Sequence, residues 1–430
     1  MSTPLLPDPE HAPLAVIGLG YVGLPLAVAF GCKRPTVGFD TDVKRIDRLQ
    51  AGIDATQQVT AAQLDAATCL QFSHDPALLR HCSIYIIAVP TPIDEQNTPN
   101  LTPLCEASRC IARLLKPGDL VIYESTVYPG TTEEICIPLL QTGSGLRCNH
   151  DFFCGYSPER INPGDKSRQL SDICKITSGS TANTAECVDA LYRTIITAGT
   201  WLAPSIRVAE AAKVVENIQR DVNIALINEL AMLFGQLDID TQDVIDAAAT
   251  KWNFSPFRPG LVGGHCIGVD PYYLLHKSHS IGFQPELIET ARRVNTRVEQ
   301  HILQRIIDLL TQRGRSLHGC RVLQLGITFK EDCPDLRNSR ALRLARLLCD
   351  QGALVDLCDP CADLEEAASL MQMPVYRAPL SPPYHVIILA VAHATYCRFE
   401  AAHVRALAAE EAVVFDVKSV WPRTIVTARL

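Results

Sequence analysis

Residues 14–23 read Leu14-Ala15-Val16-Ile17-Gly18-Leu19-Gly20-Tyr21-Val22-Gly23. The first four residues form a short apolar run of the strand type, and the glycines follow as Gly-x-Gly-x-x-Gly. Residues 24–30 continue as an expected helix, in which Pro25 is tolerated only in the first turn. A second apolar run, 36–39, predicts a strand that ends at Asp40. Strand, glycine loop, helix, strand and acid together form the full context of a dinucleotide-binding unit.

Each glycine of this loop has its own expected task. Gly18 allows the tight turn, Gly20 lets backbone N–H groups approach a pyrophosphate, and Gly23 lets the helix pack on the strand. The helix N-terminus adds partial positive charge for the phosphates. Asp40 is expected to accept hydrogen bonds from both ribose hydroxyls, which favours NAD over NADP, although the nearby Arg45 could instead hold a phosphate.

The composition excludes several classes of protein. The 430 residues carry 39 Lys and Arg against 47 Asp and Glu, and this net charge of -8 argues against nucleic-acid binding. Without a long apolar run or a signal peptide in residues 1–13, we expect a cytoplasmic protein with no membrane partner. Most of the 17 cysteines are expected to be reduced core residues. The single pair Cys358-x-x-Cys361 does not predict zinc, so no metal is expected.

The pattern of elements predicts an α/β protein with two Rossmann-like doubly wound domains joined by a long central helical region. The predicted domains are an NAD-binding domain over 1–205, a central helical domain with the cysteine loop over 206–316, and a second Rossmann-like domain over 317–430. Strands are expected at 83–89, 120–123, 322–326, 355–357, 386–391 and 412–415, and helices at 105–115, 207–237, 285–313 and 339–349. A loop is expected over 255–271, and the long helix is expected to form a dimer surface.

The long helix carries Glu210-x-x-Lys213-x-x-x-Asn217. Positions four apart share one face of a helix, so Lys213 and Asn217 project to the same side. An ammonium and an amide there can bind a developing oxyanion or position a water. An ordinary exposed helical face is the alternative interpretation.

The loop 260–270 reads Gly-Leu-Val-Gly-Gly-His-Cys-Ile-Gly-Val-Asp. Among the seventeen cysteines, Cys266 alone is surrounded by glycines with a carboxylate, Asp270, four residues on. Such a thiol can be an activated nucleophile, and a buried structural cysteine is the alternative. His265 is adjacent to Cys266 and is expected to shape the loop, because neighbouring side chains usually point apart.

Four further fragments carry polar groups where ligands bind in open sheets. Residues 89–92 (Val-Pro-Thr-Pro) and 124–127 (Glu-Ser-Thr-Val) each follow a predicted strand. Residues 156–164 place a carboxylate in a turn-rich loop, and residues 329–339 place cations before a helix of the second Rossmann-like domain. Taken singly, each fragment is better explained as an ordinary solvated loop.

Together these motifs closely resemble the UDP-glucose/GDP-mannose dehydrogenase family, from Gly18 to about Lys418. Enzymes for UDP-glucose typically read Gly-Phe-Gly-Gly-Ser-Cys in the cysteine loop. The reading here, Gly-Gly-His-Cys-Ile-Gly-Val-Asp-Pro-Tyr-Tyr, is similar to the UDP-N-acetylhexosamine 6-dehydrogenase branch. Within it, the ending most resembles enzymes that oxidise UDP-GlcNAc or UDP-GalNAc for capsule and O-antigen synthesis.

The resemblance implies three sets of site residues. The catalytic set is Thr126, Glu159, Lys213, Asn217, Cys266 and Asp270. The NAD-binding set is Gly18, Leu19, Gly20, Tyr21, Val22, Gly23, Asp40, Arg45, Thr91, Thr126 and Arg337. The substrate-binding set is Glu159, Arg160, Lys213, Asn217, Arg258, Gly260, Gly263, Phe329, Lys330 and Lys418. One position departs from many UDP-glucose enzymes, because Pro163 stands where they carry a second glutamate.

The resemblance also implies a four-electron oxidation at C6 of the sugar, through a thiohemiacetal and a thioester on Cys266. Lys213 and Asn217 would stabilise oxyanions, Asp270 would orient water or Lys213, and Glu159 would assist proton transfer during hydrolysis. Rival interpretations are a UDP-ManNAc or UDP-glucose dehydrogenase, a two-electron hydroxyacid-type dehydrogenase, and a non-catalytic NAD sensor. The hexosamine epimer, feedback regulation, the polysaccharide supplied and any assembly beyond a homodimer stay open.

Overall fold

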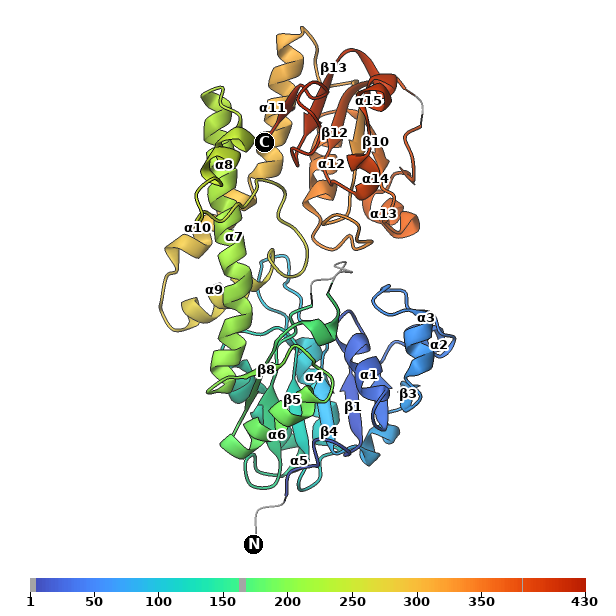
Figure 1. Ribbon diagram of the computed structural model, residues 1–430, viewed down its shortest axis with the longest axis vertical. Helices are drawn as coiled ribbons and strands as arrows, with labels where there is room; N and C mark the ends of the chain where they lie inside the picture. Colours follow the sequence, from blue (N-terminus) through green and yellow to red (C-terminus); the bar gives the residue numbers. More distant parts are fainter. Residues whose placement is uncertain (1–4, 162–167, 381) are drawn as a thin grey trace. The chain divides into compact units, whose positions relative to one another are not determined.

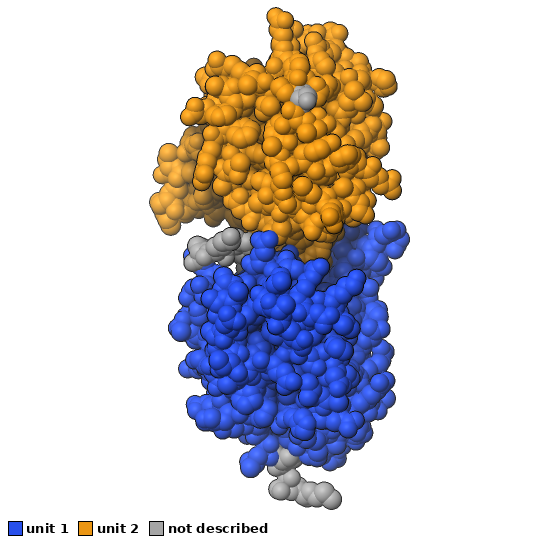
Figure 2. Space-filling view, turned by 90° about the vertical axis from the view of Figure 1, so that its right-hand side faces the viewer, with its two compact units in different colours: residues 1–216, 272–283 blue, residues 217–271, 284–430 orange. Residues whose placement is uncertain are grey.

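The computed structural model describes residues 5–161, 168–380 and 382–430, and these divide into two compact units (Figure 2). Unit 1 comprises residues 1–216 and 272–283, and unit 2 comprises residues 217–271 and 284–430. The division crosses the long helix α7 (Ile206–Gln236). The predicted domain boundaries at 205 and 316 were placed where the sequence pattern changes and not by compactness. They stay predictions.

Within the described part of unit 1, eight strands form one sheet in the order β3-β2-β1-β4-β5-β6-β7-β8 (Figure 1). All neighbours pair in parallel except β6 and β7, which are antiparallel. The order reverses between β1 and β4, the switch point at which doubly wound sheets bind ligands. The strands are β1 (Leu14–Ile17), β2 (Thr36–Phe39), β3 (Leu70–Ser73), β4 (Ile84–Ile87), β5 (Leu120–Tyr123), β6 (Phe153–Tyr156), β7 (Lys175–Gly179) and β8 (Thr200–Leu202).

Both faces of this sheet are buried, which explains why its strands read as continuous apolar runs. Alternate residues of β1 belong to different cores: Leu14 and Val16 pack with one set of helices, and Ala15 and Ile17 pack with another. The first core includes α1 (Gly23–Gly31) and α6 (Ala182–Arg193). The second includes α4 (Thr102–Ala112), the start of α7, and α5 (Ile137–Ser144), which a π-helical turn (Thr132–Cys136) precedes. The remaining helices of this part are α2 (Val43–Gln50) and α3 (Ala61–Ala66).

In the described part of unit 2, six parallel strands form a second sheet in the order β11-β10-β9-β12-β13-β14. Counted within its own sheet, this order is the same 3-2-1-4-5-6 that begins the first sheet, so two Rossmann-like sheets are present as predicted. The strands are β9 (Arg321–Leu325), β10 (Leu354–Cys358), β11 (Val375–Tyr376), β12 (Tyr384–Leu389), β13 (Ala408–Asp416) and β14 (Ala428–Arg429). The helices near it are α11 (Val298–Gln312), α12 (Arg340–Asp350), α13 (Leu364–Met371), α14 (Ala394–Cys397) and α15 (Ala401–Leu407).

The helical region between the sheets matches the prediction in part. Helix α7 covers Ile206–Gln236, close to the predicted 207–237. The single helix predicted over 285–313 is wrong, because α10 (Glu286–Asn295) ends before α11 begins at Val298. The loop predicted over 255–271 also ends too late, since α9 (Asp270–Ser280) begins at Asp270. Helix α8 (Thr241–Ala248) was not predicted.

All 17 cysteines lie in the described ranges and are free thiols. Cys82, Cys154 and Cys358 are buried, as expected for core residues. Seven of the 17 are buried, six are half-buried, and Cys32, Cys69, Cys174 and Cys397 are exposed, so the expectation that most of them are core residues is wrong. None of the helices in the described part of the chain is long and apolar enough to span a bilayer.

Candidate active site

The glycine loop joins β1 to α1, and two of its glycines are required by packing. Gly18 has φ +89°, and a Cβ there would lie 2.9 Å from the carbonyl oxygen of Ala88. A Cβ on Gly23 would lie 1.8 Å from the Gly18 oxygen, so only hydrogen fits. A Cβ on Gly20 would meet no atom within 4 Å. Space beside Gly20, together with the uncapped α1 N-terminus at Val22, fits a bound pyrophosphate.

Asp40 and Arg45 lie against the same loop. One carboxylate oxygen of Asp40, at the end of β2, accepts a hydrogen bond from the Leu19 N–H at 2.8 Å. The other accepts from the Asp42 N–H at 3.0 Å. Arg45 Nε donates to the Leu19 carbonyl at 2.5 Å, and Arg45 Nη2 lies 3.5 Å from Asp54. The structure therefore brings these two predicted NAD-binding residues to the glycine loop.

The loops after β4 and β5 are tied together at the carboxyl edge of the sheet. Thr91 Oγ1 donates to the Thr126 carbonyl at 2.7 Å, and Ser125 Oγ donates to the Val89 carbonyl at 2.7 Å. Tyr273 of α9 donates its hydroxyl to the Thr91 carbonyl at 2.6 Å. Thr91 and Thr126 are thus neighbours, as the expected cofactor role requires.

Glu159 follows β6 and is buried. Its Oε1 accepts hydrogen bonds from the backbone N–H groups of Arg160 and Ile161, both at 2.6 Å. Its Oε2 accepts from Lys175 Nζ at 2.9 Å. Arg160 itself pairs with Glu216 at 3.2 Å. Pro163, the position that departs from many UDP-glucose enzymes, lies outside the described residues.

Lys213 and Asn217 lie one turn apart on α7, and both side chains are buried. The Asn217 amide nitrogen donates to Asp270 Oδ2 at 2.5 Å, and the amide oxygen accepts from Arg220. Asp270 is almost fully buried, as the first residue of α9. Two predicted catalytic residues, Asn217 and Asp270, are therefore in direct contact.

Cys266 is half-buried, and its carbonyl accepts from the N–H groups of Val269 at 3.0 Å and Asp270 at 2.8 Å. This turn leads directly into α9. Further along the chain, Arg292 Nη1 donates to the Ile267 carbonyl at 3.3 Å and pairs through Nε with Asp221 of α7 at 3.3 Å. Arg292 of α10, paired with Asp221 of α7, therefore holds the backbone immediately after Cys266 in place.

The start of the cysteine loop is held by a side-chain amide. Asn228 of α7 accepts from the Gly260 N–H at 2.8 Å and donates to the Gly260 carbonyl at 3.1 Å. Asn228 also donates to Asn295 at 2.8 Å, and Asn295 donates to the Asp221 carboxylate at 2.7 Å. All three of these polar side chains are buried, so each depends on the others for hydrogen bonds.

The cysteine loop packs on the loop after β9, within unit 2. A Cβ on Gly263 would lie 2.6 Å from the Asn338 oxygen, and a Cβ on Gly264, where φ is +81°, would lie 2.5 Å from the Phe329 ring. Asn338 donates to the Gly264 carbonyl at 3.2 Å. His265 meets the Phe329 ring edge-on at 5.5 Å, in line with its expected role in shaping the loop. The glycines permit this close approach.

Several predicted substrate-binding residues gather at this contact. The Lys330 ammonium lies 5.7 Å from the centre of the Phe329 ring. Lys418 pairs with Glu331 at 2.9 Å, and a Cβ on Gly260 would lie 3.6 Å from the Lys418 nitrogen. The structure therefore brings Phe329 and Lys418 to the cysteine loop, with Lys330 beside Phe329.

Arg258 and Arg337 both have carboxylate partners. The Arg258 guanidinium is half-exposed, donates to Gln242 of α8 and lies 3.8 Å from Asp246. Arg337 forms a close pair with Asp335, with contacts of 2.5–3.0 Å. Burial raises the pKa of Asp335, but hydrogen bonding and charge from Arg337 outweigh burial and lower it overall. Arg258 lies in the segment between α8 and α9, and the partners of its guanidinium, Gln242 and Asp246, belong to α8.

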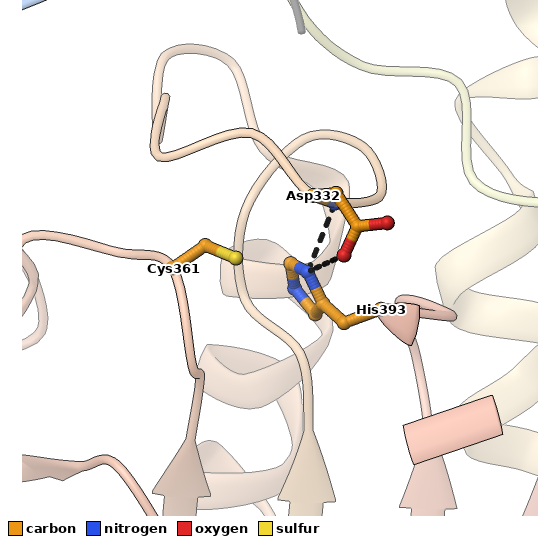
Figure 3. A group of neighbouring side chains, drawn as sticks. All are labelled: Asp332, Cys361 and His393. Carbon is orange, nitrogen blue, oxygen red and sulfur yellow. Dashed lines mark hydrogen bonds and ion pairs between the residues drawn. The ribbon is translucent and has the colours of Figure 1, made fainter. Parts of the chain in front are cut away.

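Asp332, Cys361 and His393 place atoms of metal-ligand type close together (Figure 3). His393 Nδ1 accepts from the Asp332 backbone N–H at 3.0 Å, because an N–H can only donate. The ring proton therefore lies on Nε2 and faces Asp359 at 3.0 Å. Both ring nitrogens are used by the protein, so this group holds the loop after β9 and does not present an open metal site.

Sequence reasoning missed the residues that hold this machinery in place. Lys175 lies on a short strand that was not predicted, and Asn228, Asp221 and Arg292 lie on helices whose polar residues resemble solvated faces. For Asp221, the spacing of residues along α7 is a sequence signal that could have revealed it. Asp221 follows Asn217 by four residues, so it continues the same face of α7.

Glu210 anchors the beginning of α7, and it provides a test of the pH dependence of stability. Its two oxygens accept from the backbone N–H groups of Gly130 at 2.6 Å and Thr132 at 2.9 Å. Burial raises the pKa of Glu210 to about 7, although these donors oppose the rise. A raised folded-state pKa means that this residue's contribution to stability is full at low pH and is lost as the pH rises from about 4.5 to about 7.

We therefore expect Glu210→Gln to gain stability relative to the unaltered protein as the pH rises. Between pH 5 and pH 8 the difference in free energy of unfolding between the variant and the unaltered protein should grow by about 2–3 kcal/mol, since one pKa unit corresponds to about 1.4 kcal/mol. Urea unfolding at both pH values measures it. A difference that does not change with pH would contradict the assignment, whatever constant offset the amide introduces.

Comparison with known proteins agrees with this geometry. Residues 12–196, 207–297 and 323–423 match the NAD binding, central and UDP binding domains of the UDP-glucose/GDP-mannose dehydrogenase family. A Pseudomonas aeruginosa UDP-N-acetyl-D-glucosamine 6-dehydrogenase is 54% identical over 405 residues, 94% of this chain and 96% of that protein. A Salmonella typhi protein of the same name is 49% identical over 413 residues, covering 96% and 97%.

Among solved structures, the UDP-D-ManNAc dehydrogenase of Pyrococcus horikoshii matches with a TM-score of 0.86 at 28% identity, covering 97% of this chain and 98% of that one. Its similarity extends over both sheets and the helices between them. The chain belongs to the UDP-glucose/GDP-mannose dehydrogenase family and is an NAD-dependent nucleotide-sugar dehydrogenase.

Proposed function

We propose that the protein oxidises C6 of UDP-N-acetyl-D-glucosamine to the uronic acid, in two steps, for surface polysaccharide synthesis. The single observation that carries the substrate is the 54% identity to a protein named for that reaction, spread over nearly the whole chain. The cysteine loop supports the reaction, because its glycines let the backbone that precedes Cys266 pack closely against Phe329 and Asn338.

The residues that would hold the cofactor are those of the glycine loop with Asp40, Arg45, Thr91, Thr126 and Arg337. Open space beside Gly20 and the uncapped start of α1 fit the pyrophosphate. When bound, NAD supplies the acceptor for a hydride from C6 in each of two oxidations. Asp40, placed by the Leu19 N–H, would orient the ribose.

The other residues act on the sugar. The Cys266 thiolate adds to the aldehyde carbon left by the first oxidation, forming a thiohemiacetal. The Lys213 ammonium and the Asn217 amide stabilise the oxyanion at each stage. Asp270 orients Asn217 through their 2.5 Å hydrogen bond. After the second oxidation, water adds to the thioester carbon, the C–S bond breaks, and Glu159 accepts the proton from the water.

Initial rates with four substrates test the substrate assignment. We expect kcat/KM to be highest for UDP-GlcNAc, ahead of UDP-GalNAc, UDP-ManNAc and UDP-glucose, with an acid as the product. A preference for UDP-ManNAc or UDP-glucose would overturn the proposal and select a rival within the family. NAD binding without turnover of any of the four would support the sensor interpretation instead.

Cofactor choice can be tested at Asp40. Asp40→Asn removes the negative charge that would accept from the ribose hydroxyls and repel a 2′-phosphate. We expect kcat/KM for NAD to fall about tenfold, equivalent to about 1.4 kcal/mol, and the preference for NAD over NADP to shrink. Kinetics with both cofactors measure this. An unchanged ratio would mean that Arg45, rather than Asp40, decides the choice.

We further propose a cytoplasmic homodimer or higher homo-oligomer. Helix α7 exposes Val215, Leu226 and Leu233, whose relative residue accessibilities are 54%, 55% and 48%. A row of apolar residues on one long helix supports contact with a second copy. Light scattering of the purified protein tests this, and a monomer at micromolar concentration would contradict it. The location follows from the need for NAD and nucleotide sugars.

A further inference from the structure

In unit 1, the buried Lys175 forms ion pairs with two buried carboxylates, Glu124 and Glu159. Lys175 Nζ lies 2.7 Å from Glu124 Oε2 and 2.9 Å from Glu159 Oε2, and only 2% of the lysine side chain is exposed. Tyr192 of α6 donates to the second oxygen of Glu124, and the Lys175 ammonium lies 5.3 Å from the centre of the Tyr192 ring. Every member of this cluster comes from a different element: β7, the ends of β5 and β6, and α6.

The arrangement restrains Glu159 completely. Two backbone N–H groups hold Oε1, and Lys175 holds Oε2, so the carboxylate plane cannot rotate without losing a hydrogen bond. Buried charges are costly unless paired, and removing one partner leaves the other uncompensated. Lys175 is therefore required for a negatively charged Glu159 in this position.

The electrostatics agree with the contacts. Burial lowers the pKa of Lys175, but the charges of Glu124 and Glu159 outweigh burial and raise it, so the lysine is a stable cation. Burial raises the pKa of Glu124 to about 7; the Lys175 charge opposes the rise and the Glu159 charge adds to it. Lys175 contacts both carboxylates, through Oε2 of Glu124 at 2.7 Å and Oε2 of Glu159 at 2.9 Å.

We propose that Lys175, with Glu124 as its second partner, is a positioning residue for thioester hydrolysis: it pairs with the Glu159 carboxylate and keeps it oriented to accept a proton from water. This inference rests on the proposed function, in which Glu159 serves the hydrolysis of a Cys266 thioester. The ammonium keeps its own protons, and the proton from water passes to Glu159 and then to solvent.

The test measures each step separately in the full-length enzyme with NAD and UDP-GlcNAc. In Lys175→Met we expect the two oxidations of the first turnover to proceed, giving a burst of two NADH per active site. The following steady rate should fall about 100-fold, the lower range for loss of a general base. Intact-protein mass spectrometry should show the sugar acylated on Cys266. A merely structural defect would slow the oxidations as well and leave no acyl-enzyme.

Two further variants keep the test decisive. Glu124→Gln combined with Lys175→Met removes one negative and one positive charge together, so it keeps the charge balance if the single variant fails to fold. It should show the same accumulation of acyl-enzyme. Thr177→Val is the matched control, because Thr177 lies two residues along β7, is equally buried, and bonds Asp189 at 2.8 Å instead of the cluster. It should hydrolyse at the rate of the unaltered enzyme.

The outcomes separate the two levels of the proposal. Two NADH per sugar from the unaltered enzyme, with ordinary hydrolysis in both Lys175 variants, would overturn the role of Lys175 alone. A single NADH per sugar from the unaltered enzyme, with Cys266→Ala retaining full rate, would overturn the proposed function and the role of Lys175 with it. Acyl-enzyme accumulation confined to the Lys175 variants supports both.

Discussion

Cys266→Ser is expected to abolish the formation of uronic acid. The hydroxyl is a far weaker nucleophile than a thiolate, so the aldehyde from the first oxidation is not captured and no thioester forms. Steady-state release of NADH should fall by at least roughly 10³-fold, as on removal of other covalent nucleophiles. NADH formation and product analysis by mass spectrometry measure the two parts of this result.

Cys110→Ser provides the control for Cys266, because Cys110 is also half-buried but lies on α4, far along the chain from the cysteine loop. It should retain ordinary rates and two NADH per sugar. Full four-electron turnover in Cys266→Ser would rule out the covalent scheme.

Lys213→Met is expected to produce the second large effect. Methionine keeps the length and apolar stem of the side chain but removes the charge that stabilises the oxyanion. Loss of one such donor typically lowers kcat about 10²–10³-fold, and because the donor acts on charge developed during reaction, KM should change little. Steady-state kinetics with UDP-GlcNAc separate kcat from KM.

Arg207→Met is a suitable comparison on the same helix. Arg207 also belongs to α7, but it is exposed and pairs with Glu133 at 2.5 Å, and surface pairs of this kind contribute little to stability. Its activity should remain within about twofold of the unaltered enzyme. If Lys213→Met lost affinity for the substrate at unchanged kcat, Lys213 would be a binding residue and not part of the oxyanion site.

The sequence was sufficient to predict the parts of the fold that depend on local patterns. Continuous apolar runs predicted β1, β2 and β5, because both faces of the first sheet are covered. The glycine spacing predicted the loop in which a Cβ on Gly23 would collide with Gly18. The break between α10 and α11 was missed because residues 295–298, Asn-Thr-Arg-Val, contain neither proline nor glycine.

The site residues were predictable only where they belong to a motif of residues close together in the sequence. Cys266, Lys213 and Asn217 stand in recognisable motifs. Lys175 and Arg292 do not, since their partners Glu159 and Asp221 lie 16 and 71 positions away. Whether such a charged residue faces water or a buried carboxylate depends on which strands and helices become neighbours. A single sequence contains no local signal for that choice.

The covalent four-electron mechanism is tested most directly by the amount of NADH released per molecule of UDP-GlcNAc when the sugar is consumed completely in excess NAD. We expect two NADH per sugar, with the uronic acid as the product. One NADH per sugar, with an aldehyde or ketone as the product, would contradict it and identify a two-electron dehydrogenase that has no need of Cys266.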